Sequence, residues 1–198
     1  MAIKLASIFF TMILVDNYVL AKFLGICPFL GVSKKLDSAV GMSLAVTFVM
    51  VMATAATWPL YMGILAPNGL KYLQTIVFIL VIAILVQLLE NFLKKFIPAL
   101  YKSLGVYLPL ITTNCTILGV TILNLDNGYS FPESIVCAAG AGIGFLVAMV
   151  LFSGVRRKVE QAIVPECFKG LPITLVAAAM TSLSFMGFGG IVEAIFGV

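Results

Sequence analysis

Cys27-Pro28-Phe29-Leu30-Gly31-Val32 is the stretch that decides the fold, because its frame, Cys-x-x-Leu-Gly-Val, returns 88 positions later as Cys115-Thr116-Ile117-Leu118-Gly119-Val120. Both copies lie in hydrophobic sequence beside residues that membrane helices usually avoid. Those residues are Gly25 and Pro28 at the first copy and Pro109, Thr112, Thr113 and Asn114 before the second. Irregular backbone at membrane depth is tolerated only where protein or a cavity satisfies its free N–H and C=O groups. We therefore predict that both hydrophobic stretches are broken near their cysteine and that the two breaks face each other inside the protein.

The composition is that of an integral membrane protein. Hydrophobic residues make up 62% of the 198 positions and charged residues 10%, whereas about a quarter of the residues of soluble domains are charged. No small-residue cleavage site follows the first hydrophobic segment, so we expect a retained span rather than a removed signal peptide. The chain has no histidine, which excludes His-ligated metals and His-based acid/base catalysis.

The hydrophobic pattern predicts an all-α membrane protein with six transmembrane helices. About 20 apolar residues are needed to cross the hydrocarbon core. The first stretch, 2–32, is too long for one straight span, and the other predicted spans are 38–70, 73–89, 104–125, 134–155 and 171–192. Nine of the twelve basic residues lie in the first, third and fifth loops, which the positive-inside rule assigns to the cytoplasm. Both termini are then predicted on the outer side of the membrane.

Three predicted spans precede the long third loop and three follow it. An odd number of spans makes the second half cross the membrane in the opposite direction, so the repeated cysteine frame marks a 3+3 inverted-topology repeat with halves of about 1–95 and 96–198. In such folds the broken helices of the two halves meet near the middle of the bilayer. We therefore expect a single integral membrane domain, 1–198, in which broken helices 1 and 4 bring Cys27 and Cys115 together.

The cysteines at equivalent positions of the two halves are the candidate metal ligands. Cys27 and Cys115 each adjoin a predicted break, whereas Cys137 and Cys167 do not and are expected to be inert. Groups suited to donate hydrogen bonds to sulfur flank the second ligand: Thr112, Thr113, Asn114 and Thr116. Such hydrogen bonds are one means of tuning an iron–sulfur cluster. Two thiolates are half of the Cys₄ set of a [2Fe–2S] cluster, so either the other two cysteines or another protein completes it, and we favour a partner protein.

Three stretches carry a resemblance to a known family: NYVLAKFLGICPFLGVSKK at 17–35, YLPLITTNC at 107–115 and FMGF at 185–188. Over nearly its whole length the chain resembles the A-type membrane subunits of the Rnf complex, the ion-translocating ferredoxin:NAD oxidoreductase of bacterial membranes, which is related to the Na⁺-pumping NADH:quinone oxidoreductases. The resemblance implies that Cys27 and Cys115 bind a [2Fe–2S] cluster within the membrane and that a homologous E-type subunit supplies the other two cysteines. It further implies an electron-carrying subunit of the bacterial inner membrane, whose partners hold flavins and further clusters.

The chain itself is not expected to convert a substrate, because it contains no recognisable nucleotide site or covalent flavin-attachment motif. Its candidate ion-pathway residues are Asp16 and Glu90, since ionisable groups within spans are functional candidates by default. Each has an ordinary alternative. Glu90 and Lys94 have the spacing of a helical ion pair, and Asp16 and Lys22 are able to neutralise partners in neighbouring helices. The sequence leaves open whether the transported ion is Na⁺ or H⁺.

Two other functions are compatible with parts of this pattern. A small secondary transporter or channel with no redox centre would also use an inverted repeat with broken helices and a polar Thr-Thr-Asn segment. A thiol redox sensor would need exposed cysteines of low pKa, and we expect Cys27 and Cys115 to be buried in apolar spans, which disfavours that role. Loss of a cluster on replacing either cysteine separates the electron carrier from the transporter.

Overall fold

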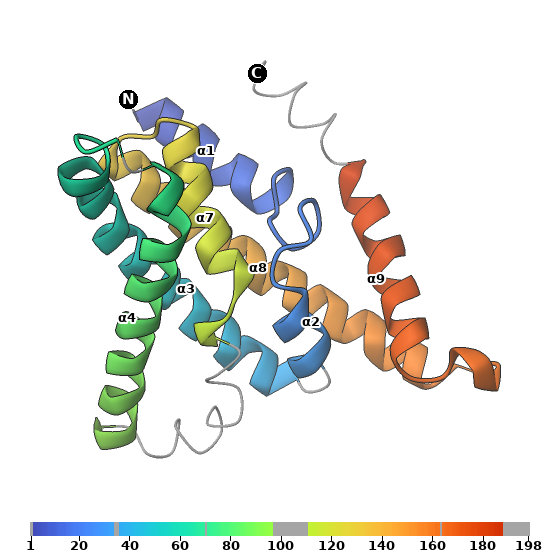
Figure 1. Ribbon diagram of the computed structural model, residues 1–198. Helices are drawn as coiled ribbons and strands as arrows, with labels where there is room; N and C mark the ends of the chain where they lie inside the picture. Colours follow the sequence, from blue (N-terminus) through green and yellow to red (C-terminus); the bar gives the residue numbers. More distant parts are fainter. Residues whose placement is uncertain (1, 34–35, 70, 97–110, 163, 188–198) are drawn as a thin grey trace.

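The computed structural model describes residues 2–33, 36–69, 71–96, 111–162 and 164–187, and these are helical with short connections (Figure 1). The α-helices are α1 (Ala2–Leu14), α2 (Ile26–Val32), α3 (Leu36–Leu60), α4 (Gln74–Phe96), α7 (Cys115–Asp126), α8 (Phe131–Glu160) and α9 (Leu171–Met186). A π-helical turn, Tyr61–Leu65, follows α3, and short 3₁₀ segments, Lys71–Leu73 and Glu166–Phe168, precede α4 and α9. The all-α class is confirmed.

Three helical segments in the described part of the chain are long and apolar enough to cross a membrane: Leu36–Leu65, Lys71–Asn91 and Phe131–Glu160. They correspond to the predicted spans 38–70, 73–89 and 134–155. Shorter apolar helices, Lys4–Leu14, Cys115–Asp126 and Leu171–Met186, lie in the other three predicted spans. The first part of the predicted span 104–125 and the end of the span 171–192 fall outside the described residues. The six-span inverted repeat therefore stays a prediction.

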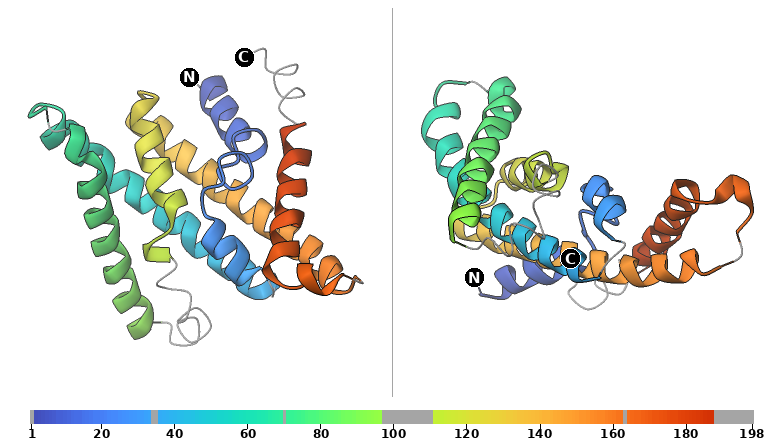
Figure 2. Two further views of the ribbon diagram at one scale, coloured as in Figure 1. Left: turned by 45° about the vertical axis from the view of Figure 1, so that its right-hand side comes forward. Right: turned by 90° about the horizontal axis from the view of Figure 1, so that it is seen from below.

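The central layer of the bundle consists of α3 and α8, which pack on each other and supply half of the residues of the buried hydrophobic cluster. Seen from below, α1 lies on one side of α8, and α4, α7, α2 and α9 stand on the other side (Figure 2). In that second group α7 and α2 occupy the middle, with α4 and α9 at the two ends. The two helices whose first turn holds a candidate cysteine, α2 and α7, thus lie between α4 and α9.

Small residues let α1 approach α8 closely. A Cβ added to Gly140 would lie 3.1 Å from the carbonyl oxygen of Phe9, and one added to Gly144 would lie 3.0 Å from that of Met12. Because the two glycines are four residues apart, they share one face of α8. Close backbone approach over small residues is the usual means of helix association in a membrane, and here it positions the start of the first break.

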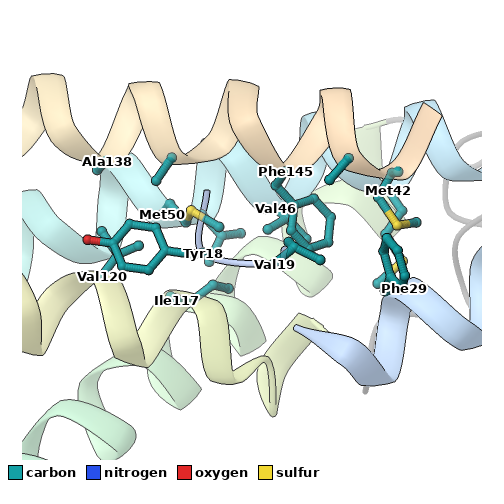
Figure 3. Close-up of a cluster of buried hydrophobic side chains, with 14 of the residues drawn as sticks. Tyr18, Val19, Phe29, Met42, Val46, Met50, Ile117, Val120, Ala138 and Phe145 are labelled. Atoms are coloured by element: carbon teal, nitrogen blue, oxygen red, sulfur yellow. The ribbon is translucent and has the colours of Figure 1, made fainter. Parts of the chain in front are cut away.

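Residues 15–25 form the break between α1 and α2, and one buried side chain organises them. Asn17 accepts the backbone N–H of Val19 at 3.1 Å and that of Leu20 at 3.4 Å, and its Nδ2 donates to the carbonyl of Gly144 at 2.8 Å. Tyr18 and Val19 insert between α7 and α8 in the core (Figure 3). The predicted break of helix 1 is confirmed, and Asn17 pairs with two of its freed backbone N–H groups, the kind of internal partner that irregular backbone needs at membrane depth.

Charged contacts fix both ends of α8. At its start, Lys4 of α1 lies 2.7 Å from Glu133. At its end, the guanidinium of Arg156 donates to the carbonyl of Leu30 and, at 2.8 Å, to Ser33 Oγ, so it caps the C-terminus of α2. The half-helix α2 is therefore attached to the bundle at the end away from its cysteine.

Candidate functional site

Both candidate ligands lie in the first turn of a half-helix. Cys27 is the second residue of α2, and Cys115 is the first residue of α7. Asn114 caps α7 through its Oδ1, which accepts the backbone N–H of Thr116 at 3.1 Å. The first turn of a helix carries free N–H groups and the positive end of the helix dipole. The start of α7 is thus a favourable place for a negatively charged sulfur.

The two breaks meet at a direct contact between Gly25 and Cys115. The backbone N–H of Gly25 donates to Cys115 Sγ at 2.9 Å across 90 residues of sequence. Gly25 has φ 85°, a conformation that favours glycine. A Cβ there would collide with Thr116 Oγ1 and lie 3.0 Å from the ring of Phe145. The prediction that the breaks face each other is confirmed, and the contact is made two residues before Cys27.

Both thiols are exposed on the surface of the chain, so the expectation that Cys27 and Cys115 are buried within their own chain is wrong. The physical reason is the direction that each half-helix turns toward the core. Pro28, which follows the first cysteine, is buried, and so is Thr116, which follows the second. Each thiol therefore lies on the side of its helix that this chain leaves uncovered.

The other two cysteines do not join this pair. Cys137 is fully buried in α8, as expected of an inert cysteine, and Cys167 is exposed in the 3₁₀ segment before α9. In the described part of the chain no three Cys, Asp, Glu or His side chains come together as a metal site. The donor set at the breaks is two exposed thiols, which in number and type fits half of the Cys₄ set of a [2Fe–2S] cluster.

The polar residues before Cys115 border a cavity of about 390 Å³ between α4 and the start of α7. Its lining includes Thr113 and Asn114 on one side and Ile79 of α4 on the other. Asn114 Nδ2 is buried and has no hydrogen-bond partner among the described residues. The predicted neighbours thus lie beside the sulfur, but the donor that the structure shows for Cys115 is the backbone of Gly25.

Known proteins are similar in sequence to this chain over nearly its full length. A family model described as "Rnf-Nqr subunit, membrane protein" matches residues 5–192. The chain belongs to the Rnf-Nqr family. Over 180 residues, 91% of this chain and 93% of the relative, it is 55% identical to the A-type subunit of the ion-translocating oxidoreductase complex of Syntrophotalea carbinolica. Over 186 residues, 94% of this chain and 97% of the relative, it is 53% identical to the A-type subunit of the Na⁺-translocating ferredoxin:NAD⁺ oxidoreductase complex of Acetobacterium woodii. The resemblance to the A-type subunits of Rnf complexes is confirmed.

In this Rnf-Nqr chain the two candidate ion-pathway carboxylates lie in different surroundings. Asp16 lies in the first break, 3.9 Å from Lys22 Nζ, and both side chains are partly exposed. Lys22 also lies over the ring of Tyr18, 4.9 Å from its centroid. Glu90 is partly buried on α4, seven residues beyond Ala83 of the cavity lining, which is about 10 Å along a helix. Neither carboxylate lines the cavity at Cys115, and their roles stay predictions.

Sequence reasoning misses the residues that hold the first break of the Rnf-Nqr chain in place. The sequence assigns no role to Asn17, or to Ser182 of α9, whose Oγ donates to the carbonyl of Leu20. It predicts Gly25 only as a helix breaker. A glycine shortly before Cys-Pro signals an interruption of the helix, but it does not identify the sulfur of Cys115 as the partner of its N–H group.

Proposed function

We propose that this chain is the membrane subunit of an ion-translocating ferredoxin:NAD⁺ oxidoreductase complex, in which it carries electrons across the membrane through a [2Fe–2S] cluster. Membership of the Rnf-Nqr family and the names of its relatives support the redox complex. Cys27 and Cys115 supply two of the four cluster ligands. A homologous subunit of the E type supplies the other two, and further subunits carry the flavins and remaining clusters. The complex lies in the bacterial inner membrane with both termini of this chain outside.

One observation carries the proposal: two half-helices, far apart in sequence, each present an exposed cysteine next to the point where their breaks touch. A transporter site would gain nothing from exposed thiols at both breaks, whereas a cluster shared between two subunits requires ligands on the surface of each. The absence of a third ligand near them, within the described residues, fits the same requirement.

Residues of the chain prepare these positions before any ligand binds. Cys27 and Cys115 bind iron as thiolates, and the N–H of Gly25 stabilises negative charge on the second sulfur. Ile79 of α4 and its apolar neighbours line the cavity beside Cys115. The cluster supplies one-electron transfer at a place between the two faces of a hydrocarbon core about 30 Å thick.

Electron transfer is coupled in this proposal to the transport of Na⁺ or H⁺; one relative belongs to a complex named ion-translocating and another to a complex named Na⁺-translocating. Asp16 and Glu90 are the carboxylates of this chain assigned to the ion pathway. Replacing each by its amide, Asp16→Asn and Glu90→Gln, is expected to reduce ion transport while leaving the iron content of the complex unchanged.

The test uses the chain's own four cysteines. Complexes carrying Cys27→Ser or Cys115→Ser are compared with Cys137→Ser and Cys167→Ser by electron paramagnetic resonance after reduction, together with iron and sulfide analysis. We expect the first two to lose one [2Fe–2S] signal and about two irons per complex, and the two controls to keep both. Subunit composition is checked by gel electrophoresis, so that loss of the cluster is separated from loss of the complex.

Protection of the thiols provides a second readout. In the chain produced without its partners, a maleimide is expected to label Cys27, Cys115 and Cys167 but not the buried Cys137. In the assembled complex the first two are expected to become unreactive while Cys167 stays reactive. An unchanged iron inventory in both Cys27→Ser and Cys115→Ser complexes would refute the ligand assignment and would favour the transporter without a redox centre.

A further inference from the structure

The helices α8 and α9 diverge from the turn that joins them (Figure 1), and the crevice between them is hollow at its base. A cavity of about 460 Å³ lies there, at the end of the bundle that the sequence predicts to face the cytoplasm. Arg156 and Lys169 line it together with apolar side chains such as Phe152 and Ile173. Glu160, the partner of Arg156 at 3.3 Å, also lines it, so the cavity has two basic groups and one carboxylate beside an apolar wall.

A second cavity of about 400 Å³ adjoins the first, since Val159 and Ala177 line both. It follows α9 as far as Phe185, and its walls are apolar apart from Thr181 and Ser184. From Leu171 to Phe185 the helix rises about 21 Å, which exceeds the depth of about 15 Å of one leaflet. The two cavities together form a crevice with a basic end and a long apolar continuation.

At the basic end of the crevice, Arg156 and Lys169 have hydrogen-bond donors that are not fully used by described residues. Arg156 uses its Nε for Glu160 and its Nη1 for α2, and no described residue accepts a bond from its Nη2. Lys169 pairs with Glu166 at 3.4 Å, but both side chains are largely exposed, and an exposed pair of this kind is weak. Two cations are therefore able to engage an anion in the crevice.

The segment 156–169 around the basic end of the crevice also carries a net positive charge. Arg157 and Lys158 follow Arg156 on α8, so 156–169 holds four basic residues against Glu160 and Glu166. Basic pockets between transmembrane helices on the cytoplasmic side bind anionic lipid headgroups. A free phosphate would use only the basic end, whereas an amphiphile would use the whole crevice.

We propose that the crevice between α8 and α9 binds an anionic glycerophospholipid, with the phosphate at Arg156 and Lys169 and an acyl chain along α9 past Ala177. This site is separate from the cysteines and does not depend on the cluster. Because Arg156 also holds the C-terminus of α2 through Leu30 and Ser33, the bound lipid adjoins the half-helix that carries Cys27.

The test is photolabelling of the complex in phosphatidylcholine vesicles. Trace phosphatidylglycerol or phosphatidylcholine is added, each with a photoreactive diazirine on the same acyl chain, and labelled peptides are mapped by mass spectrometry. We expect phosphatidylglycerol to label 151–185 at least about fivefold more than phosphatidylcholine, and Lys169→Gln to lower that preference about fivefold, since one basic residue near the surface contributes about 1 kcal/mol. Lys158→Gln, which removes the same charge from α8 outside the cavity lining, is the matched control and should keep the preference.

Four results would overturn the proposal in whole or in part. Equal labelling by the two lipids would mean that the crevice contacts only bulk lipid. An equal loss of the preference for phosphatidylglycerol in Lys158→Gln and Lys169→Gln would show that general surface charge causes the preference. Crosslinks from 151–185 to a neighbouring subunit in place of lipid would show that protein fills the crevice. Competition by millimolar inorganic phosphate would show that the headgroup alone is the ligand and would reject the acyl-chain part of the site.

Discussion

Replacing Gly25 by alanine tests whether the contact between the two breaks holds this chain together. The new Cβ must adopt φ 85° and must displace Thr116 Oγ1 and the ring of Phe145. A left-handed conformation costs about 1 to 2 kcal/mol for a residue with a Cβ, and overpacking a tight site costs about 1 to 3 kcal/mol. We therefore expect Gly25→Ala to destabilise the chain by roughly 2 to 5 kcal/mol and to weaken the N–H bond to Cys115.

Two other glycines separate these contributions. Gly128 also has positive φ, 66°, but no atom lies within 4 Å of an added Cβ, so Gly128→Ala measures the backbone cost by itself. Gly154 lies within α8 with the same open space, and Gly154→Ala should be neutral or stabilising by up to about 1 kcal/mol. Each variant is compared by the temperature at which half of the purified complex is lost from its size-exclusion peak. One kcal/mol corresponds to about 2 to 4 °C for domains of this size.

A second substitution, Thr116→Ala, tests whether the collision with Thr116 causes the loss of stability in Gly25→Ala. Thr116 Oγ1 is buried without a hydrogen-bond partner among the described residues, so Thr116→Ala should be tolerated and should recover about 1 kcal/mol or more of stability in the Gly25→Ala background. The cluster signal should recover with it. Two results would show that the two breaks are not in this contact. One is a melting temperature of Gly25→Ala equal to that of Gly154→Ala. The other is a further loss of stability when Thr116→Ala is added to Gly25→Ala.

Three further predictions concern the supports of the break and of α8. Asn17→Ala should cost about 2 to 4 kcal/mol and lower the melting temperature, because it removes the acceptor of the buried N–H groups of Val19 and Leu20 and the bond from the break to Gly144. Ser182→Ala, which removes one donor from α9 to the break, should cost about 1 kcal/mol in the same assay. Glu133→Gln breaks the ion pair with Lys4, so it should lower the melting temperature at low salt, and the difference from the wild type should shrink at high salt.

The sequence predicts the class of fold and the position of the break through local properties. Long uncharged stretches identify the three clear spans, because a membrane selects for apolar length. The repeated cysteine frame identifies Cys27 and Cys115 as a pair, because identical spacing in two hydrophobic stretches places them at equivalent points. Both inferences use patterns within single stretches of sequence, and neither requires knowing which segments are in contact.

The features that the sequence does not predict are contacts between distant segments. The bond from Gly25 to Cys115 joins residues 90 positions apart, and that from Asn17 to Gly144 joins residues 127 positions apart. Neither local stretch indicates which residue its partner is. The prediction that the thiols are buried is wrong for a related reason. An apolar stretch shows that a segment lies in the membrane, but it does not show which face of a short half-helix its own bundle covers.

The exposed thiols and the internally supported break together suggest an order of assembly for the proposed carrier. Asn17 and Gly25 satisfy the first break with groups of this chain alone, so the break does not need a cluster to keep its shape. The thiols, in contrast, are covered only when another chain packs against them. A complex of Cys27→Ser subunits should therefore assemble with normal stoichiometry and melt close to the wild type without partner loss, while lacking the cluster. Failure of these subunits to associate at all would mean that the cluster, rather than the prepared surface, joins the two membrane subunits.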